Sequence, residues 1–227
     1  MRMRKYSFMM LLLIFLSPLN LVRADDQLAV ILEGIREKYG SLPGLNVLYE
    51  REIISKSMVL LGDQKNGDLA TGRIYFKPPH FLKVAQETPT PEAVITDGDT
   101  LWWYIPYKKQ VYRYPSHKLG QELRLLGDIF QGLREVEESF EVILLEDGDN
   151  EGKHQLRLTP NPPWPQIDHI NLSIDKGDYP IRMVEIHNYI GSITIFTLGD
   201  IAVQETFEED FFRFVTPEGV KVIEEDG

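Results

Sequence analysis

The chain has 227 residues, of which 43% are hydrophobic and 26% charged, a balance that suits one globular domain with a buried core. It contains no cysteine, which excludes disulfide bonds, thiolate chemistry and lipid attachment to a cysteine. Four of the 24 lysines and arginines lie in the first 24 residues, which leaves 20 against 35 aspartates and glutamates. This acidic balance argues against binding to nucleic acid or to anionic lipid headgroups.

The first residues of the chain have the pattern of a secretion signal. Basic residues precede an apolar run from Phe8 to Leu16, which is too short to span a bilayer, and Val22 and Ala24 are small residues at the cleavage positions. We predict a signal peptide over residues 1–24, cleaved after Ala24, and one domain over residues 25–227. An uncleaved membrane anchor is the alternative. The domain is expected to be soluble and to lie outside the cytoplasm.

An amphipathic helix is predicted directly after the signal segment. Its apolar residues recur at the spacing of one helical face, namely Leu28, Ile31, Leu32 and Ile35. Gly40 ends the pattern. Two strands, Val47 to Leu61 and Asp68 to Lys77, are then expected to form a hairpin around the polar segment 62–67.

The stretch from Gly72 to Tyr114 is rich in large aromatic side chains and is interrupted by turn residues at 77–80 and 97–98. Apolar and charged residues alternate along its first strands, with Ile74, Phe76, Leu82 and Val84 on one side and Arg73, Lys77 and Lys83 on the other. Such alternation predicts a curved antiparallel sheet with one apolar face and one face in water.

The turn at Asp97-Gly98 decides which tryptophan belongs to the apolar face. A two-residue turn would pair Val94 with Leu101 and place both on one face with Trp103. A longer turn would instead put Trp102 on that face. The sequence leaves both registers open.

A second amphipathic helix is predicted after residue 116, with a break near Gly127 or Gly132 and a further helical turn over 134–139. Its apolar face comprises Leu119, Leu123, Leu126, Ile129, Phe130 and Leu133. Strands are then expected over 140–145, 155–159, 167–174, 181–187, 193–203, 211–215 and 220–223. About eleven strands and two or three helices predict an α+β domain, one wide sheet with helices on one face.

No group of residues in the sequence indicates recognisable chemistry. The five histidines are scattered without an HExxH motif, and there is no GxSxG nucleophile motif. We therefore predict no catalytic residue, no metal and no cofactor, and we expect that the protein is not an enzyme. A plain packed core and a ligand cavity remain equal interpretations of the aromatic-rich sheet.

Motifs in two parts of the chain resemble those of a known family. They are Gly72-x-x-x-x-Lys77-x-Pro79 followed by Asp97-Gly98-x-x-Leu101-Trp102-x-Tyr104-x-Pro106 and Gln110-Val111, and Phe212-x-Phe214-x-x-Pro217-x-Gly219-Val220-x-Val222-Ile223 near the C-terminus. These motifs resemble those of the periplasmic lipoprotein carriers of the LolA type, and the resemblance covers essentially the whole mature chain. The resemblance implies an incomplete antiparallel β-barrel in which α-helices form a lid over a hydrophobic cavity.

The resemblance also implies a function. Such a carrier is a periplasmic monomer that accepts lipoproteins from an inner-membrane ABC transporter of the LolCDE type. It shields their acyl chains in its cavity and delivers them to an outer-membrane lipoprotein receptor of the LolB type. No covalent chemistry is needed, because each acceptor must only bind the acyl chains more strongly than the previous one. A periplasmic regulator that senses lipids or peptides on the same half-barrel is the alternative.

The predicted site residues follow from the alternation and from the resemblance. The cavity wall is predicted to comprise Ile74, Phe76, Leu82, Val84, Val94, Leu101 and Trp103. The lid is predicted to comprise Leu28, Ile31, Leu32, Ile35, Leu123, Leu126, Ile129 and Phe130. Carriers of this type place an arginine before the proline that matches Pro79, where it hydrogen-bonds to the lid. This chain has Pro78 there, so Lys77 and His80 become the candidates for holding the lid.

Overall fold

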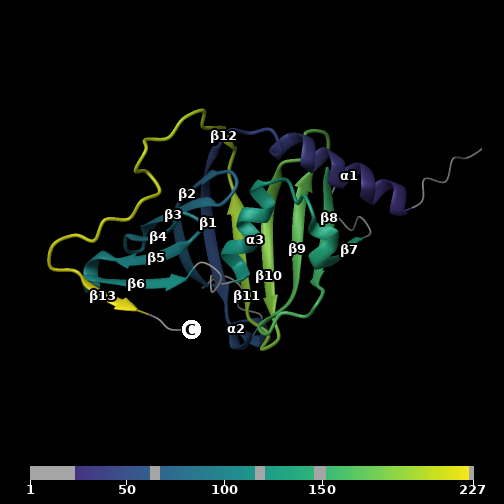
Figure 1. Cartoon of the computed structure of the whole chain (residues 1–227). Helices are drawn as coiled ribbons and strands as arrows, with labels where there is room; N and C mark the ends of the chain where they lie inside the picture. Colours follow the sequence, from purple (N-terminus) through teal and green to yellow (C-terminus); the bar gives the residue numbers. More distant parts are fainter. Residues whose placement is uncertain (1–23, 62–66, 116–120, 146–151, 225–227) are drawn as a thin grey trace, which may run out of the picture.

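The protein is described by a computed structural model that covers residues 24–61, 67–115, 121–145 and 152–224 (Figure 1). One wide, curved sheet carries helices on one of its faces. The predicted signal peptide up to residue 23 and the predicted turn at 62–66 lie outside the described residues, as does Leu119. Within the described part of the chain, no helix combines the length and the apolar character needed to span a membrane.

Helices α3 and α4 divide the strands into a first group and a later group along the chain. The helices are α1 (Ala24–Tyr39), α2 (Lys56–Leu61), α3 (Gln121–Phe130) and α4 (Val136–Ser139), with a 3₁₀ turn η1 (Pro106–Lys108). The first strands are β1 (Leu45–Ile54), β2 (Asp68–Lys77), β3 (Phe81–Thr88), β4 (Glu92–Thr96), β5 (Thr100–Ile105) and β6 (Gln110–Pro115). The later strands are β7 (Phe140–Leu144), β8 (Lys153–Pro160), β9 (Ile167–Asp175), β10 (Ile181–Asn188), β11 (Ile193–Leu198), β12 (Ala202–Val203) and β13 (Lys221–Glu224).

The strands form one sheet in the order β13-β6-β5-β4-β3-β2-β1-β11-β10-β9-β8-β7, with β12 beside β1. All of these pairs are antiparallel except β13 with β6. The two ends of this path, β13 and β7, are not paired with each other, so the barrel is incomplete. This confirms the predicted α+β class and the incomplete antiparallel barrel with helices. The described residues contain thirteen strands, against about eleven expected.

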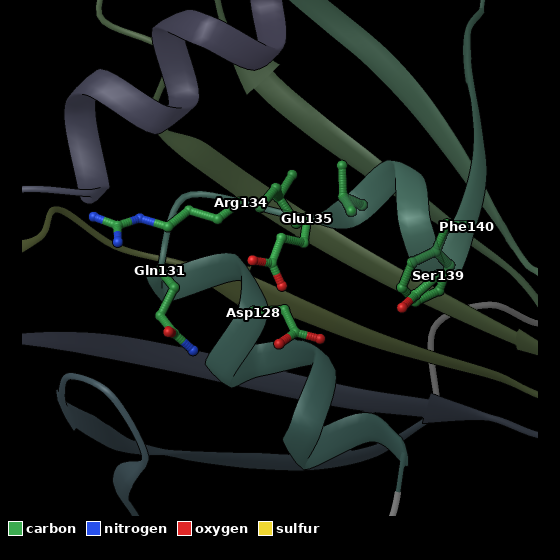
Figure 2. Close-up of a pocket in the computed structure, with 8 residues that line it drawn as sticks. Asp128, Gln131, Arg134, Glu135, Ser139 and Phe140 are labelled. Atoms are coloured by element: carbon green, nitrogen blue, oxygen red, sulfur yellow. The ribbon is translucent and has the colours of Figure 1, made fainter.

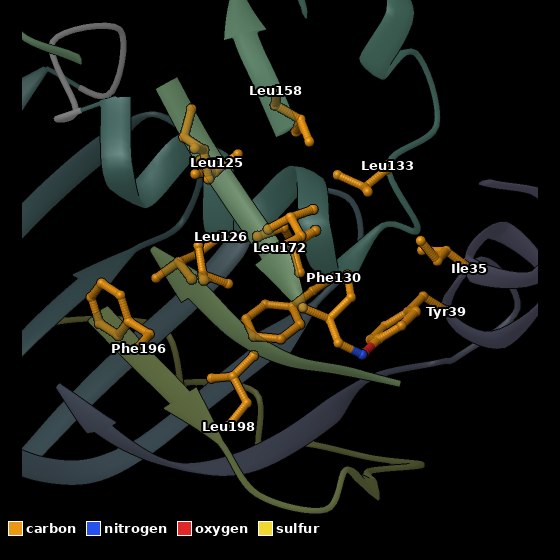
Figure 3. Close-up of a cluster of buried hydrophobic side chains, with 14 of the residues drawn as sticks. Ile35, Tyr39, Leu125, Leu126, Phe130, Leu133, Leu158, Leu172, Phe196 and Leu198 are labelled. Carbon is orange, nitrogen blue, oxygen red and sulfur yellow. The ribbon is translucent and has the colours of Figure 1, made fainter. Parts of the chain in front are cut away.

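The core lies between the concave face of the sheet and helices α1 and α3 (Figure 3). Ile35 and Tyr39 of α1 meet Phe130 of α3 and the sheet residue Leu172, all at most 1% exposed. The Tyr39 hydroxyl accepts a 2.9 Å hydrogen bond from the backbone N–H of Ile181 at the start of β10, and burial raises its pKa to about 12. Helix α1 is therefore fixed to the β7–β10 half of the sheet.

The predicted helix after residue 116 is confirmed as α3, followed by the short α4. It passes through Gly127 without a break and ends before Gly132, whose φ is +80°. A side chain at Gly132 would press against the backbone of Ile35 and Arg36 in α1. Glycine therefore permits both the left-handed turn and the close approach of the two helices.

The prediction of a strand from Val47 to Leu61 is wrong in its second half, because β1 ends at Ile54 and α2 begins at Lys56. Ser55 initiates the helix, since its hydroxyl accepts a 3.4 Å hydrogen bond from the backbone N–H of Met58. The apolar residues after Met58 resemble a continuing strand in the sequence, and the short serine cap is the signal that distinguishes the helix.

The prediction of a strand over Phe211 to Val215 is also wrong. Phe211 packs against Tyr75 and the next residue, Phe212, packs against Phe81, with ring centroids 5.0 and 5.5 Å apart. Successive residues of a strand would point to opposite sides, so two neighbouring rings on the same sheet face require turns instead. The Phe211 N–H donates to the Glu208 carbonyl oxygen in such a turn.

These phenylalanines change the character of the outer sheet face, which the alternation predicted to be in water. Phe214 packs against Trp102 and Tyr104 on that face, with centroids 5.4 and 5.3 Å away. The Lys83 ammonium lies 4.3 Å from the centre of the Phe211 ring, and its burial lowers the pKa of Lys83. The C-terminal segment that contains Phe211, Phe212 and Phe214 therefore covers part of the outer face and shields it from water.

Candidate cavities beside helix α3

The register between β4 and β5 settles which tryptophan faces the concave side. Val94 is paired with Trp103 and Thr96 with Leu101, so four residues, 97–100, lie between the last paired positions of β4 and β5. This register differs by two residues from the one that a two-residue turn would give. Because side chains alternate with a period of two, a shift of two leaves each residue on its face. Val94, Leu101 and Trp103 thus share the concave face, and Trp102 lies on the outer one.

A first cavity of about 520 Å³ lies between α3 and the ends of strands β2 to β5 that lead into the turns at Pro79 and Gly98. Phe76, Leu82 and Leu123 supply apolar lining. Polar residues also line this cavity. They come from the turn after β2, the end of β4, helix α3 and the segment after it, and they are His80, Thr96, Arg124, Asp128, Gln131 and Glu135. The cavity is therefore apolar on the sheet side and polar at its rim.

A second cavity of about 290 Å³ lies under α3 near the opposite ends of β3 and β4. Its apolar lining includes Val84, Val94, Trp103, Leu126 and Phe196. Leu123 lines both cavities, so the two spaces are neighbours separated by the side of α3 that carries this residue.

The predicted cavity residues fall into two groups. Phe76, Leu82, Val84, Val94 and Trp103 line one of the two cavities. Ile74 and Leu101 lie on the same face but are buried, 0% and 5% exposed, and line neither.

The predicted lid residues are divided in the same way. From α3, Leu123 and Leu126 line the cavities, whereas Ile129 and Phe130 are buried in the core. The α1 residues also belong to the core rather than to either cavity, and they are Leu28, Ile31, Leu32 and Ile35. The role of these residues in opening the protein stays a prediction.

The prediction from the sequence missed the polar residues of the cavities. Arg51 and Glu92 line the second cavity, and Arg124 and Asp128 line the first. One signal was present, because Arg51 is in phase with Val47 and Tyr49 on the buried side of β1. A charged residue in phase with a buried apolar row is expected to face the interior.

A third, smaller pocket of about 150 Å³ adjoins the first cavity where α3 turns into α4 (Figure 2). Asp128 and Glu135 line both spaces, and the Glu135 side chain extends toward Asp128 in Figure 2. Burial raises the pKa of Asp128 from 3.8 to about 6, Arg124 opposes this rise, and Glu135 adds to it. The rim of the first cavity therefore changes its charge in mildly acidic solution.

The raised pKa of Asp128 predicts a pH-dependent stability. The folded protein holds this proton more strongly than the unfolded chain, so the contribution to stability is fully present below about pH 4 and is lost as the pH rises to about 6. Asp128→Asn is expected to be more stable than the unmodified protein near pH 8, by about 1 kcal/mol after allowance for partial exposure. Urea unfolding near pH 4 and near pH 8 measures this difference.

The control for this prediction is Asp178→Asn, which changes an exposed aspartate in the β9–β10 turn. This variant is expected to keep the pH dependence of the unmodified protein. An Asp128→Asn variant whose stability changed with pH in parallel with the unmodified protein would contradict the assignment to Asp128.

The first and second cavities suit apolar chains. Apolar residues form much of their lining on the sheet side, and within the described residues no group of three or more histidines and carboxylates is placed to hold a metal ion. Ligand pockets with apolar walls and a few polar groups bind mainly through removal of apolar surface from water.

Comparison with known proteins places the chain in a family. The family model described as outer membrane lipoprotein carrier protein LolA matches residues 58–215. The outer-membrane lipoprotein carrier protein of Halorhodospira halophila is 30% identical over 166 residues, which cover 72% of each chain. That of Pseudomonas paraeruginosa is 25% identical over 213 residues, which cover 91% of this chain and 92% of the other.

A solved structure agrees at the level of the fold. It is an uncharacterized conserved protein from Thermus thermophilus, with a TM-score of 0.55 and 10% identity, over 88% of this chain and 99% of that one. The match of the family model to most of the chain is specific, and the open antiparallel sheet with its helices has the architecture expected of such proteins. This chain therefore belongs to the LolA family of outer-membrane lipoprotein carrier proteins.

Proposed function

We propose that this protein is a periplasmic carrier that shields the acyl chains of lipoproteins between the two membranes. It accepts its cargo from an inner-membrane ABC transporter of the LolCDE type and delivers it to an outer-membrane receptor of the LolB type. The carrier acts by binding and release and is not an enzyme. The signal segment, cleaved after Ala24, directs it to the periplasm.

The observation that supports this proposal best is the pair of cavities that share Leu123 beside α3. Each CH₂ group that moves from water into an apolar wall contributes about 0.8 kcal/mol, so a cavity lined by such residues favours long chains. Most of the core remains packed without the cargo, because α1 and the C-terminal half of α3 are buried against the sheet. We infer that the N-terminal half of α3, around Leu123, moves when acyl chains enter.

Mass spectrometry of the protein purified from its native periplasm tests the proposal. Intact acylated lipoprotein, bound in a one-to-one complex and released on denaturation, is the expected result. A bound soluble metabolite in place of acyl chains would overturn the proposal, and a bound unacylated peptide would favour a sensing regulator. Protein purified after secretion of unacylated cargo alone serves as the control and should carry no lipoprotein.

A further inference from the structure

The second cavity has a polar end formed by three neighbouring strands. Arg51 of β1, Gln86 of β3 and Glu92 of β4 line it together with the apolar residues. Gln86 and Glu92 are paired across β3 and β4, and the Arg51 Nη2 donates a 3.3 Å hydrogen bond to the Gln86 Oε1. The cavity is thus amphipathic, with an apolar wall under α3 and a cationic group at one end.

The Arg51 guanidinium is incompletely satisfied by the protein. Its Nε is buried and has no hydrogen-bond acceptor among the described residues. Among the described residues no ion pair joins Arg51 to Glu92, and the Glu92 Oε2 accepts a 3.0 Å hydrogen bond from the Trp103 Nε1. A buried donor of a charged group without an acceptor is costly, so a ligand that supplied an oxygen there would gain a strong hydrogen bond.

We propose that Arg51 binds the ester carbonyl oxygens of a diacylglyceryl group whose chains occupy the apolar part of the cavities. This inference rests on the proposed carrier function and deepens it by assigning the headgroup end of the ligand. A guanidinium presents several N–H groups in one plane, which suits two neighbouring carbonyl oxygens better than a point charge does. Two sources carry this chemistry, the diacylglyceryl cysteine of a lipoprotein and a phospholipid.

The polar end would orient the ligand as well as bind it. Val84 and Val94 follow Gln86 and Glu92 along the same face of β3 and β4, so chains that leave the ester group meet apolar side chains next.

Displacement of the fluorescent dye anilinonaphthalene sulfonate from the purified mature protein tests the inference. The competitors are a dipalmitoylglyceryl-cysteine peptide and its dialkyl ether analogue, which lacks the ester carbonyls, and the diester and diether forms of phosphatidylglycerol. We expect the unmodified protein to bind an ester form about tenfold more tightly than its ether analogue, the size of one hydrogen bond to a charged group. The pair of competitors that shows this preference identifies the source.

The variants show whether Arg51 causes the preference. Arg51→Met should bind ester and ether forms equally, at the ether affinity of the unmodified protein, and Arg51→Lys should keep part of the preference. The control is Arg73→Met, which removes an arginine on the outer face of β2 that donates a hydrogen bond to Asn46. This variant should keep the full preference for the ester forms. Circular dichroism establishes that each variant is folded. If Arg51→Met does not fold, Arg51→Lys keeps the test decisive.

The possible failures are distinguishable. If no lipopeptide displaces the dye, the carrier function itself is wrong. If the lipopeptides bind but the unmodified protein does not distinguish ester from ether, or if Arg51→Met keeps the preference, the inference about Arg51 is wrong and the carrier function stands.

Discussion

Replacing Phe130 with alanine is expected to lower the free energy of unfolding by about 3–5 kcal/mol. Phe130 is the last residue of α3, is 1% exposed, and packs against Phe76 with ring centroids 5.9 Å apart. The loss combines the removal of its apolar surface from the core with the space left between α3 and the sheet (Figure 3). Urea unfolding measures it, and the melting temperature should fall by about 10 °C.

The matched control is Tyr107→Ala, which removes an aromatic ring that is 59% exposed in η1 and should change stability by at most about 0.5 kcal/mol. Phe130→Leu keeps most of the volume and should cost about 1 kcal/mol. Equal urea midpoints for Phe130→Ala and the unmodified protein would show that the end of α3 is not anchored as described. The consequence for function is that α3 would also be free to leave the cavities without cargo.

The apolar architecture was predictable from the sequence because it follows from periodicity. The helical spacing of α1 and the alternation through Phe76 and Leu82 each identify one buried face, and the structure places these residues on it. The expectation that a longer turn would put Trp102 on the apolar face is wrong, because the observed register differs from that of a two-residue turn by two residues, and an even difference keeps Trp103 on that face.

Other features depended on contacts that no local pattern encodes. Whether Phe211 and Phe212 form a strand is decided by the aromatic rings of β2 and β3 that they meet, which lie more than a hundred residues away. The charged cavity residues were missed because about a quarter of the chain is charged, and the helical position of Asp128 resembles that of any solvated acid. The pKa of Asp128 is raised mainly by its burial in the folded protein, to which the charge of Glu135 adds.

Leu82→Glu is expected to abolish loading from the transporter, a loss of at least about tenfold. Leu82 is 4% exposed and lines the first cavity beside Phe76 and Leu123. A carboxylate there would have to lose its water when acyl chains entered, and the nearby acids Asp128 and Glu135 disfavour a further negative charge. Release of a lipoprotein from inner-membrane vesicles that contain the transporter, supplied with ATP and purified carrier, measures loading.

The same change on the opposite side of the sheet provides the control. Leu48→Glu alters a leucine of β1 that is 52% exposed on the outer face and should leave release unchanged. Leu82→Gln has nearly the same shape as Leu82→Glu without the charge, so it should lose less activity and separate charge from size. Urea unfolding must show that both Leu82 variants are folded. Normal release by a folded Leu82→Glu variant would mean that acyl chains do not enter through the first cavity, and the entrance would then have to be sought at the second, beside Arg51.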